Sequence, residues 1–254
     1  LGPVDIAASC AGASALQRVA FALEGRDGTV LARNAVDMAV HRPPAADHRG
    51  DITIWSPDAD IRQHCKALGY RIGFGAEGTD VVIATKPDDT LASLVRRGGR
   101  VLLLPVAPCL LHPFFPHWQD VRVREREGTP WQGDWASSFS WLRRTGVFSG
   151  LPGGPLLDES FDRVLPDHIV TGCNLLDFHA RVHAGMVVGW VHRPAALVVE
   201  RRYGKGSLVT STFRLFRNPA GADPTATTLL DGLLRLAVGG RPAGQDAMLP
   251  AGRP

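Results

Sequence analysis

A short segment near the middle of the chain, Trp131-Gln132-Gly133-Asp134-Trp135, combines side chains that can bind a sugar. An indole ring can stack on the face of a sugar ring, and a neighbouring carboxylate or amide can hydrogen-bond the hydroxyl groups. We therefore take Trp131, Asp134 and Trp135 as candidate ligand-binding residues. The alternative is that these rings pack a small satellite core over a sheet or fill a surface between domains.

The wider stretch of residues 131–141 contains three tryptophans, interrupted by Gln, Asp, Gly and Ser. In a closed core the polar groups need hydrogen-bond partners, whereas binding surfaces are enriched in large aromatic side chains. This pattern predicts that the stretch faces a neighbour, either another domain or another subunit.

No cysteine of the chain has the sequence context of a catalytic nucleophile. An amidotransferase-type enzyme places its cysteine on a strained turn between a strand and a helix, flanked by glycines. Cys65 falls inside an expected helix, Cys109 has no glycine beside it, and Cys173 has a glycine on one side only. Together with Cys10 these residues are expected to be free thiols, and no catalytic residue is assigned.

His179 and His183 have the spacing of a metal-binding pair on one face of a helix. No third ligand stands near them in sequence, so we expect ordinary histidines and assign neither a metal nor another cofactor. Asp158, Glu159 and Asp162 lie where a loop passes into a helix, and carboxylates there act as helix caps more often than as an acid and a base.

The elements that must position these side chains are clearest in residues 52–105, where short apolar runs alternate with helical segments. Asp58 or Ser56 can cap a helix after the first run, and a second helix is expected over 90–97. The apolar runs fit strands that are buried on both faces, and they lie at 52–55, 80–84 and 101–104.

This alternation predicts parallel βαβ units, and hence one flavodoxin-like α/β domain over residues 45–240 with a mainly parallel sheet. An aromatic-rich insertion is expected at 109–167, where the periodicity is weakest. Gly204-Lys205-Gly206 predicts the turn of a hairpin, because the spacing of a phosphate-binding loop is missing. A helix over 225–238 should cover one sheet face, and residues 241–254 are expected to form a flexible tail.

Residues 17–23 and 29–40 alternate apolar and polar side chains on either side of a turn that contains two glycines and Asp27. The pattern predicts an antiparallel hairpin, and an isolated hairpin is only marginally stable in water. It must therefore pack on the α/β domain or belong to a β-sandwich. We expect residues 1–44 to be the end of such a sandwich followed by a linker.

The composition is that of an ordinary globular protein: of 254 residues, 44% are hydrophobic and 21% charged, with a formal net charge of +3. No apolar run approaches the roughly 18 residues of a membrane span, so no membrane association is expected. The arginines occur in scattered pairs and form no basic stripe, which argues against a nucleic-acid partner. The chain begins at Leu1 and not at Met, so whether it is a fragment of a longer reading frame stays open. The compartment stays open too, with the cytoplasm as the default.

Two stretches resemble a known family. Residues 24–40, which begin Glu-Gly-Arg-Asp-Gly-Thr-Val-Leu-Ala-Arg-Asn, resemble the closing strands of the immunoglobulin-like domain in family-2 glycoside hydrolases, the β-galactosidase and β-mannosidase group. In some members of that group a flavodoxin-like or amidotransferase-like domain follows, and residues 203–213, Tyr-Gly-Lys-Gly-Ser-Leu-Val-Thr-Ser-Thr-Phe, resemble a hairpin of such domains. The resemblance implies that the catalytic barrel, with its carboxylate pair, lies upstream of this chain.

Two functions from different classes remain open. In the first, the chain is a non-catalytic C-terminal accessory region of a glycoside hydrolase acting on β-linked sugars. Its partners are then upstream glycosidase domains or sister subunits, with carbohydrate as a candidate ligand. In the second, it is an independent α/β protein that binds a small molecule, or a hydrolase, with its site at the carboxyl ends of the strands.

Overall fold

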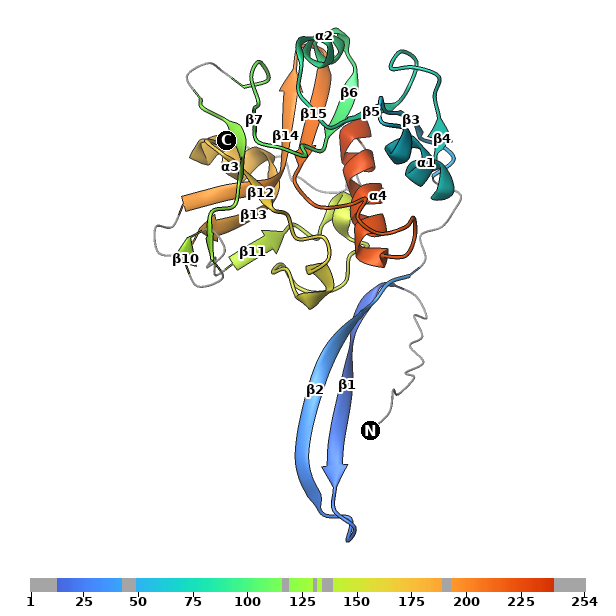
Figure 1. Cartoon of the computed structure of the whole chain (residues 1–254), viewed down its shortest axis with the longest axis vertical. Helices are drawn as coiled ribbons and strands as arrows, with labels where there is room; N and C mark the ends of the chain where they lie inside the picture. Colours follow the sequence, from blue (N-terminus) through green and yellow to red (C-terminus); the bar gives the residue numbers. More distant parts are fainter. Residues whose placement is uncertain are drawn as a thin grey trace, which may run out of the picture.

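The computed structural model describes residues 13–42, 49–115, 119–129, 132–133, 139–188 and 193–239. These residues form an α/β body from which one long hairpin extends (Figure 1). Within these ranges, no helix is both long and apolar enough to cross a membrane.

Half of the central sheet consists of parallel strands. In spatial order they are β4 (Arg71–Ile72), β3 (Thr53–Trp55), β5 (Val81–Ala84), β6 (Arg100–Leu103) and β15 (Gly206–Ser211). Val82 pairs with Trp55 on one side and with Val101 on the other, so the three strands expected from the apolar runs are neighbours. The βαβ pattern in the sequence is confirmed in this half of the sheet.

The helices beside this half begin at aspartates. They are α1 (Ala59–Ala67), α2 (Asp89–Arg97) and α4 (Pro224–Val238). The side chains of Asp58, Asp88 and Asp223 each accept hydrogen bonds from backbone amides of the first turn, which stabilises the helix start. Helix α4 ends at Gly239, whose φ of 83° is a left-handed conformation that glycine adopts without steric cost.

The other half of the sheet is antiparallel. From β15 the order continues through β14 (Arg193–Tyr203), β12 (His168–Thr171) and β8 (Arg122–Glu125) to β7 (Cys109–Leu110), which with β4 ends the path. β13 (Val182–Val188) also pairs with β14, and β11 (Phe139–Leu142) pairs with β13. The sheet is therefore mixed, and the parallel arrangement expected from sequence holds for its first half. The segment expected as an insertion at 109–167 contributes β7, β8 and β11 to the same sheet.

Short elements complete the described part of the body. β9 (Gly128–Thr129) and β10 (Gln132–Gly133) form a separate two-stranded sheet. Two 3-10 turns, η3 (Gly146–Phe148) and η4 (Glu159–Phe161), and the helix α3 (Leu175–Arg181) lie between the strands of the antiparallel half.

Two apolar cores cover the two faces of the sheet. Val81 and Ile83 of β5 belong to the core that includes α1 and α4, whereas Val82 and Ala84 belong to the core that includes α2. Consecutive side chains of a strand point to opposite faces, so a strand covered on both sides must be apolar throughout. All four residues of β5 are buried, and the body is thus three layers thick.

The hairpin is formed by β1 (Ala15–Glu24) and β2 (Val30–Val40), which pair only with each other among the described residues (Figure 1). Residues directly opposite one another share a face, so the register sorts the side chains into two sets. One face is mainly apolar, with Gln17 and Asn34 among its apolar residues Val19, Phe21, Leu23, Ala32, Val36 and Met38. The opposite face carries the ion pair of Arg18 with Asp37, with nitrogen–oxygen distances of 2.8 and 3.0 Å.

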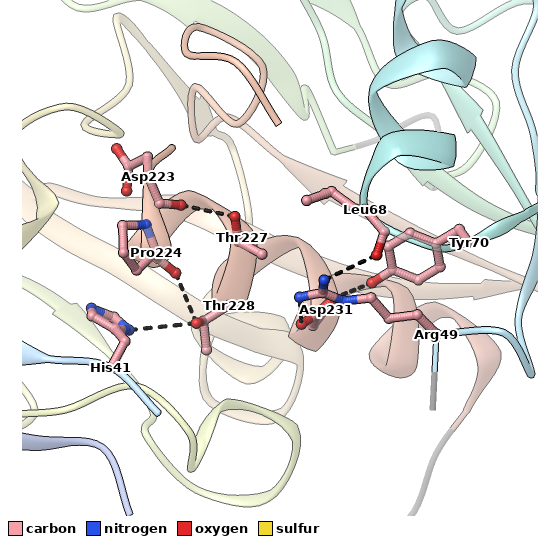
Figure 2. A network of polar contacts seen from close by, with 9 residues as sticks. All are labelled: His41, Arg49, Leu68, Tyr70, Asp223, Pro224, Thr227, Thr228 and Asp231. Carbon is pink, nitrogen blue, oxygen red and sulfur yellow. Dashed lines mark hydrogen bonds and ion pairs between the residues drawn. The ribbon is translucent and has the colours of Figure 1, made fainter. Parts of the chain in front are cut away.

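A buried ion pair links helix α4 to the segments that precede β3 and β4 (Figure 2). The Arg49 guanidinium donates to both carboxylate oxygens of Asp231, at 2.9 and 2.8 Å, and to the carbonyl oxygen of Leu68 at 3.0 Å. The Tyr70 hydroxyl donates to the same carboxylate. Because the side chains of Arg49 and Asp231 are only 12% and 9% exposed, each charge depends on the other for compensation.

His41 joins the base of the hairpin to the start of α4 (Figure 2). Its Nδ1 lies 3.5 Å from the hydroxyl of Thr228, as Figure 2 shows. Its Nε2 lies 3.1 Å from the hydroxyl of Thr225. Burial of the imidazole lowers the pKa of His41. A neutral imidazole, with one donor and one acceptor nitrogen, suits two hydroxyl partners.

Candidate functional site

A cavity of about 440 Å³ opens where the parallel strands end. Thr85 follows β5, Leu104 and Pro105 follow β6, and Thr212 follows β15, so residues from three strand ends meet in its wall. Ligands of open α/β sheets bind at this edge, beyond the carboxyl ends of the strands. The cavity is therefore the candidate functional site of the described part of the chain.

Helix α1 supplies one wall of the cavity. The Asp58 carboxylate accepts hydrogen bonds from the amides of Asp60 and Ile61, at 2.9 and 3.3 Å, and so occupies the helix N-terminus. One turn further along, the ring of His64 meets the ring of Phe216 edge to face at 4.9 Å. Burial lowers the pKa of His64, which makes the imidazole neutral at pH 7.

A second polar group of the cavity wall is formed by Arg214 and Asp167. The Arg214 Nη1 donates to both carboxylate oxygens of Asp167, each at 3.1 Å, and its Nη2 donates to the carbonyl oxygen of Asp162 at 3.4 Å. The Arg214 Nε and the His168 Nε2 are buried, and within the described ranges neither has a hydrogen-bond partner. Two nitrogens without partners in the wall of one cavity are uncommon in a folded protein, where buried polar atoms are normally paired.

The hydroxyl groups of Ser211 and Thr212 also belong to residues that line the cavity. Ser211 and Thr212 are 1% and 6% exposed and close the end of β15. The Thr212 hydroxyl donates to the carbonyl oxygen of Leu197 at 3.4 Å, and the Ser211 hydroxyl accepts from the amide of Phe213 at 3.4 Å. These hydrogen bonds to the backbone hold the two hydroxyl groups in place in the cavity wall.

The described cysteines do not supply a nucleophile. Burial raises the pKa of Cys65 to about 12 and that of Cys173 to about 11, and it also raises the pKa of Cys109. The thiolate is the reactive form of cysteine, so a raised pKa leaves these thiols unreactive near neutral pH. Amidotransferase-type chemistry receives no support from these residues.

The sequence-based candidates Trp131, Asp134 and Trp135 lie outside the described residues. Trp141, at the end of the same stretch, is half-buried on β11 and meets the ring of Phe178 edge to face at 5.9 Å. The prediction that the whole stretch faces a neighbour stays a prediction.

The histidine pair predicted as ordinary residues does not lie on one helix. His179 is on α3, whereas His183 is on β13 and lies 3.2 Å from the Glu200 carboxylate. This contact lowers the pKa of Glu200. Within the described ranges no group of three His, Cys, Asp or Glu residues is arranged to hold a metal ion.

The glycine turn predicted from Gly204-Lys205-Gly206 connects β14 and β15. Gly204 has a φ of 62°, and a Cβ on Gly206 would collide with the carbonyl oxygens of Gly99 and Val95. Glycine is required here for the turn and for close packing on the end of α2. Likewise, Asp158 caps η4 by accepting from the amide of Ser160 at 3.0 Å, which is a structural role.

Sequence reasoning placed the site at the strand ends in general terms but did not identify its residues. The signal that could have found them is the hydroxyl residue directly after two apolar strands, Thr85 after β5 and Thr212 after β15. His64, His168 and Arg214 come from three distant segments, and no local pattern connects them.

Neither a protein-family model nor a curated protein sequence matches the chain. Solved structures with a distant likeness include two β-galactosidases. The enzyme from Bacillus circulans sp. alkalophilus has 13% identity and a TM-score of 0.40, over 75% of this chain and 31% of that one. The enzyme from the Antarctic haloarchaeon Halorubrum lacusprofundi has 14% identity and a TM-score of 0.39, over 76% and 31%.

A cytoplasmic protein of Salmonella typhimurium has 10% identity and a TM-score of 0.41, over 87% of this chain and 96% of that one. The chain spans about a third of the β-galactosidases that it matches. At these TM-scores and identities, the likenesses assign the chain to no family.

Proposed function

We propose that this chain is a non-catalytic accessory region of a glycoside hydrolase acting on β-linked sugars, and that its hairpin packs against a second β-sheet of the same polypeptide. Residues 1–44 then end a β-sandwich, 45–240 form the accessory α/β domain, and 241–254 form a tail. The observation that carries the proposal is the uncovered apolar face of the β1–β2 hairpin.

The exposed side chains on that face are large. Phe21 is 47% exposed, Leu23 60%, Val36 42% and Met38 38%. Apolar area of this kind is normally removed from water, and a hairpin without a third strand or a covering layer is marginally stable. The hairpin therefore needs a partner that the described residues do not provide.

The two faces of the hairpin favour a sheet as that partner. A β-sandwich strand is apolar on its inner face and polar on its outer face, because two sheets pack face to face. The larger apolar side chains such as Phe21 and Val36 lie on one side, whereas the Arg18–Asp37 pair lies on the other side beside Leu16 and several alanines.

The assignment to a glycoside hydrolase rests on the resemblance of residues 24–40 and 203–213 to the family-2 group. The proposed partners are thus the upstream glycosidase domains.

Hydrogen exchange tests the packing of the hairpin. The full reading frame and the 254-residue chain are compared, and we expect the amides of residues 15–40 to exchange more slowly in the longer protein. Phe21→Asp should restore fast exchange in the longer protein. Ala22→Asp, a change at the adjacent exposed position on the opposite face, should leave exchange slow. Equal exchange rates in the two proteins would contradict the proposal.

Activity tests the catalytic part of the proposal. We expect the purified chain to hydrolyse neither aryl β-galactosides nor aryl β-mannosides, and the full reading frame to hydrolyse at least one of them. Turnover by the chain alone that is lost on mutating one of its own carboxylates would overturn the non-catalytic assignment.

A further inference from the structure

We propose that the cavity at the ends of β5, β6 and β15 binds a neutral, hydroxyl-rich small molecule such as a monosaccharide or polyol. This inference is independent of the accessory role, since it concerns the α/β body alone.

Size and position mark the cavity as a ligand site. Its volume of about 440 Å³ lies within the range of small-molecule pockets, roughly 300–1,000 Å³. It lies at the strand ends, where open α/β sheets bind ligands. Its wall also contains His168 and Arg214, whose partly exposed side chains carry polar groups that can hydrogen-bond a ligand.

The charges of the wall exclude an anion. In many α/β proteins the N-terminus of a helix binds a phosphate, but here the Asp58 carboxylate already accepts from the free amides of α1. Asp60 and Asp167 add two more carboxylates, against the single guanidinium of Arg214. A phosphate or carboxylate ligand would therefore meet net repulsion.

The same wall offers little unpaired charge to a cation. The Asp167 carboxylate is neutralised by Arg214 at 3.1 Å, and that of Asp58 is engaged by two amides. Only Asp60, exposed in the first turn of α1, is left without such compensation. The wall therefore presents hydrogen-bonding groups together with a negative excess that lies mainly at the solvent-exposed Asp60.

A hydroxyl-rich molecule matches this combination. Each hydroxyl both donates and accepts, so it can bond a carboxylate oxygen, a guanidinium nitrogen or a neutral imidazole such as His64. The Phe216 ring and the apolar side chains of Leu104 and Pro105 lie in the same wall and can pack against the C–H groups of a sugar ring. This mixture of a few polar groups and an apolar surface is what fixes the orientation of a small ligand.

Titrations observed by NMR test the proposal. The probes are galactose, mannose and glycerol as neutral hydroxylated molecules, ethanolamine as a cation and inorganic phosphate as an anion. Each is added up to about 50 mM, which nearly saturates a site with a millimolar Kd. We expect signal shifts that saturate for at least one neutral probe and that map to Thr85, His168 and Thr212. Tighter binding of the amine or of phosphate would overturn the proposal, and so would the absence of saturable shifts with every neutral probe.

Two variants refine the test. His64→Ala should weaken binding of the neutral probe at least about tenfold, because a hydrogen-bonding ring is lost from the wall. The matched control His179→Ala, at an exposed position outside the cavity, should leave affinity unchanged. Asp60→Asn removes charge but keeps a hydrogen-bonding side chain, so neutral binding should persist. Loss of binding in Asp60→Asn would contradict recognition of a neutral molecule.

Discussion

The strands β5 and β6 of the body and the strands β1 and β2 of the hairpin are both rich in apolar residues but differ in how far these residues are buried. Ile83 and Leu102 are fully buried in the core that includes α1 and α4, whereas Phe21 and Leu23 are 47% and 60% exposed. The central strands of the body therefore bury their apolar residues internally, and the strands of the hairpin do not. The difference indicates that stability resides in the body and that the hairpin is a surface for association.

The largest effect is expected at the buried ion pair of the body. Asp231→Ala leaves the Arg49 guanidinium and the Tyr70 hydroxyl without their acceptor, and should lower the free energy of unfolding by about 3–5 kcal/mol. Denaturant unfolding measures this. Asp89→Ala, which removes an exposed carboxylate from the first turn of α2, serves as the control and should cost less than about 1 kcal/mol. Equal losses for the two variants would show that the ion pair is dispensable.

A core truncation should have the next largest effect. Leu102→Ala removes a fully buried side chain from β6 and should cost about 3 kcal/mol, because a cavity remains in the sheet core. Leu110→Ala is the matched control on the edge strand β7, where the side chain is 57% exposed. If Leu102→Ala lowers the free energy of unfolding as little as Leu110→Ala, the core of the sheet does not hold the stability that we assign to the body.

A smaller effect is expected from acidification at the joint between hairpin and body. Since burial lowers the pKa of His41 in the folded state, the unfolded state binds the proton more readily. The stabilising contribution is present above pH 6.5, the unfolded value, and is lost as the pH falls through the lower folded pKa. Asp223 and Asp158 oppose the lowering, and Arg144 adds to it.

Unfolding at several pH values measures this contribution. The loss of stability between pH 7.5 and 5 should be smaller in His41→Gln than in the unmodified chain. An identical pH profile for both proteins would exclude His41 as its source.

The smallest effect is expected on the hairpin itself. Phe21→Ser should change the unfolding free energy of this chain by no more than about 0.5 kcal/mol, because the side chain lacks a packed environment. In the full reading frame the same change should cost about 3 kcal/mol if the face is covered there. A large loss in the isolated chain would mean that the hairpin already packs on the body.

The sequence predicted the parallel half of the fold because its signals are local. Asp58 caps α1 as expected, and the uninterrupted apolar residues of β5 and β6 indicated strands covered on both faces. The antiparallel half escaped prediction for a physical reason. β8 is Arg122–Glu125, with one buried valine among charged residues, and β7 has only two residues. Such strands form because they pair with strands that are distant in sequence, and this pairing leaves no periodic pattern of apolar residues.

The candidate site was predictable only as a location. The βαβ pattern indicates where the strand ends meet, but the choice of His64, His168 and Arg214 depends on how three separate segments approach one another. The tryptophan segment was chosen from side-chain chemistry alone, and Trp131, Asp134 and Trp135 lie outside the described residues. Without their positions in the fold, these three residues could not be compared with the cavity as candidate binding sites.

The edge strands of the central sheet affect how molecules of this protein can associate with one another. An open sheet edge is a template on which a strand of another molecule can add. The path through the sheet ends in β4 and β7, each of two residues, and the outer side of β11 is bonded to the segment around Leu157. β2, in contrast, has 11 residues and pairs only with β1 among the described residues. Self-association of the isolated chain should therefore begin at the hairpin, and covering the hairpin should suppress it.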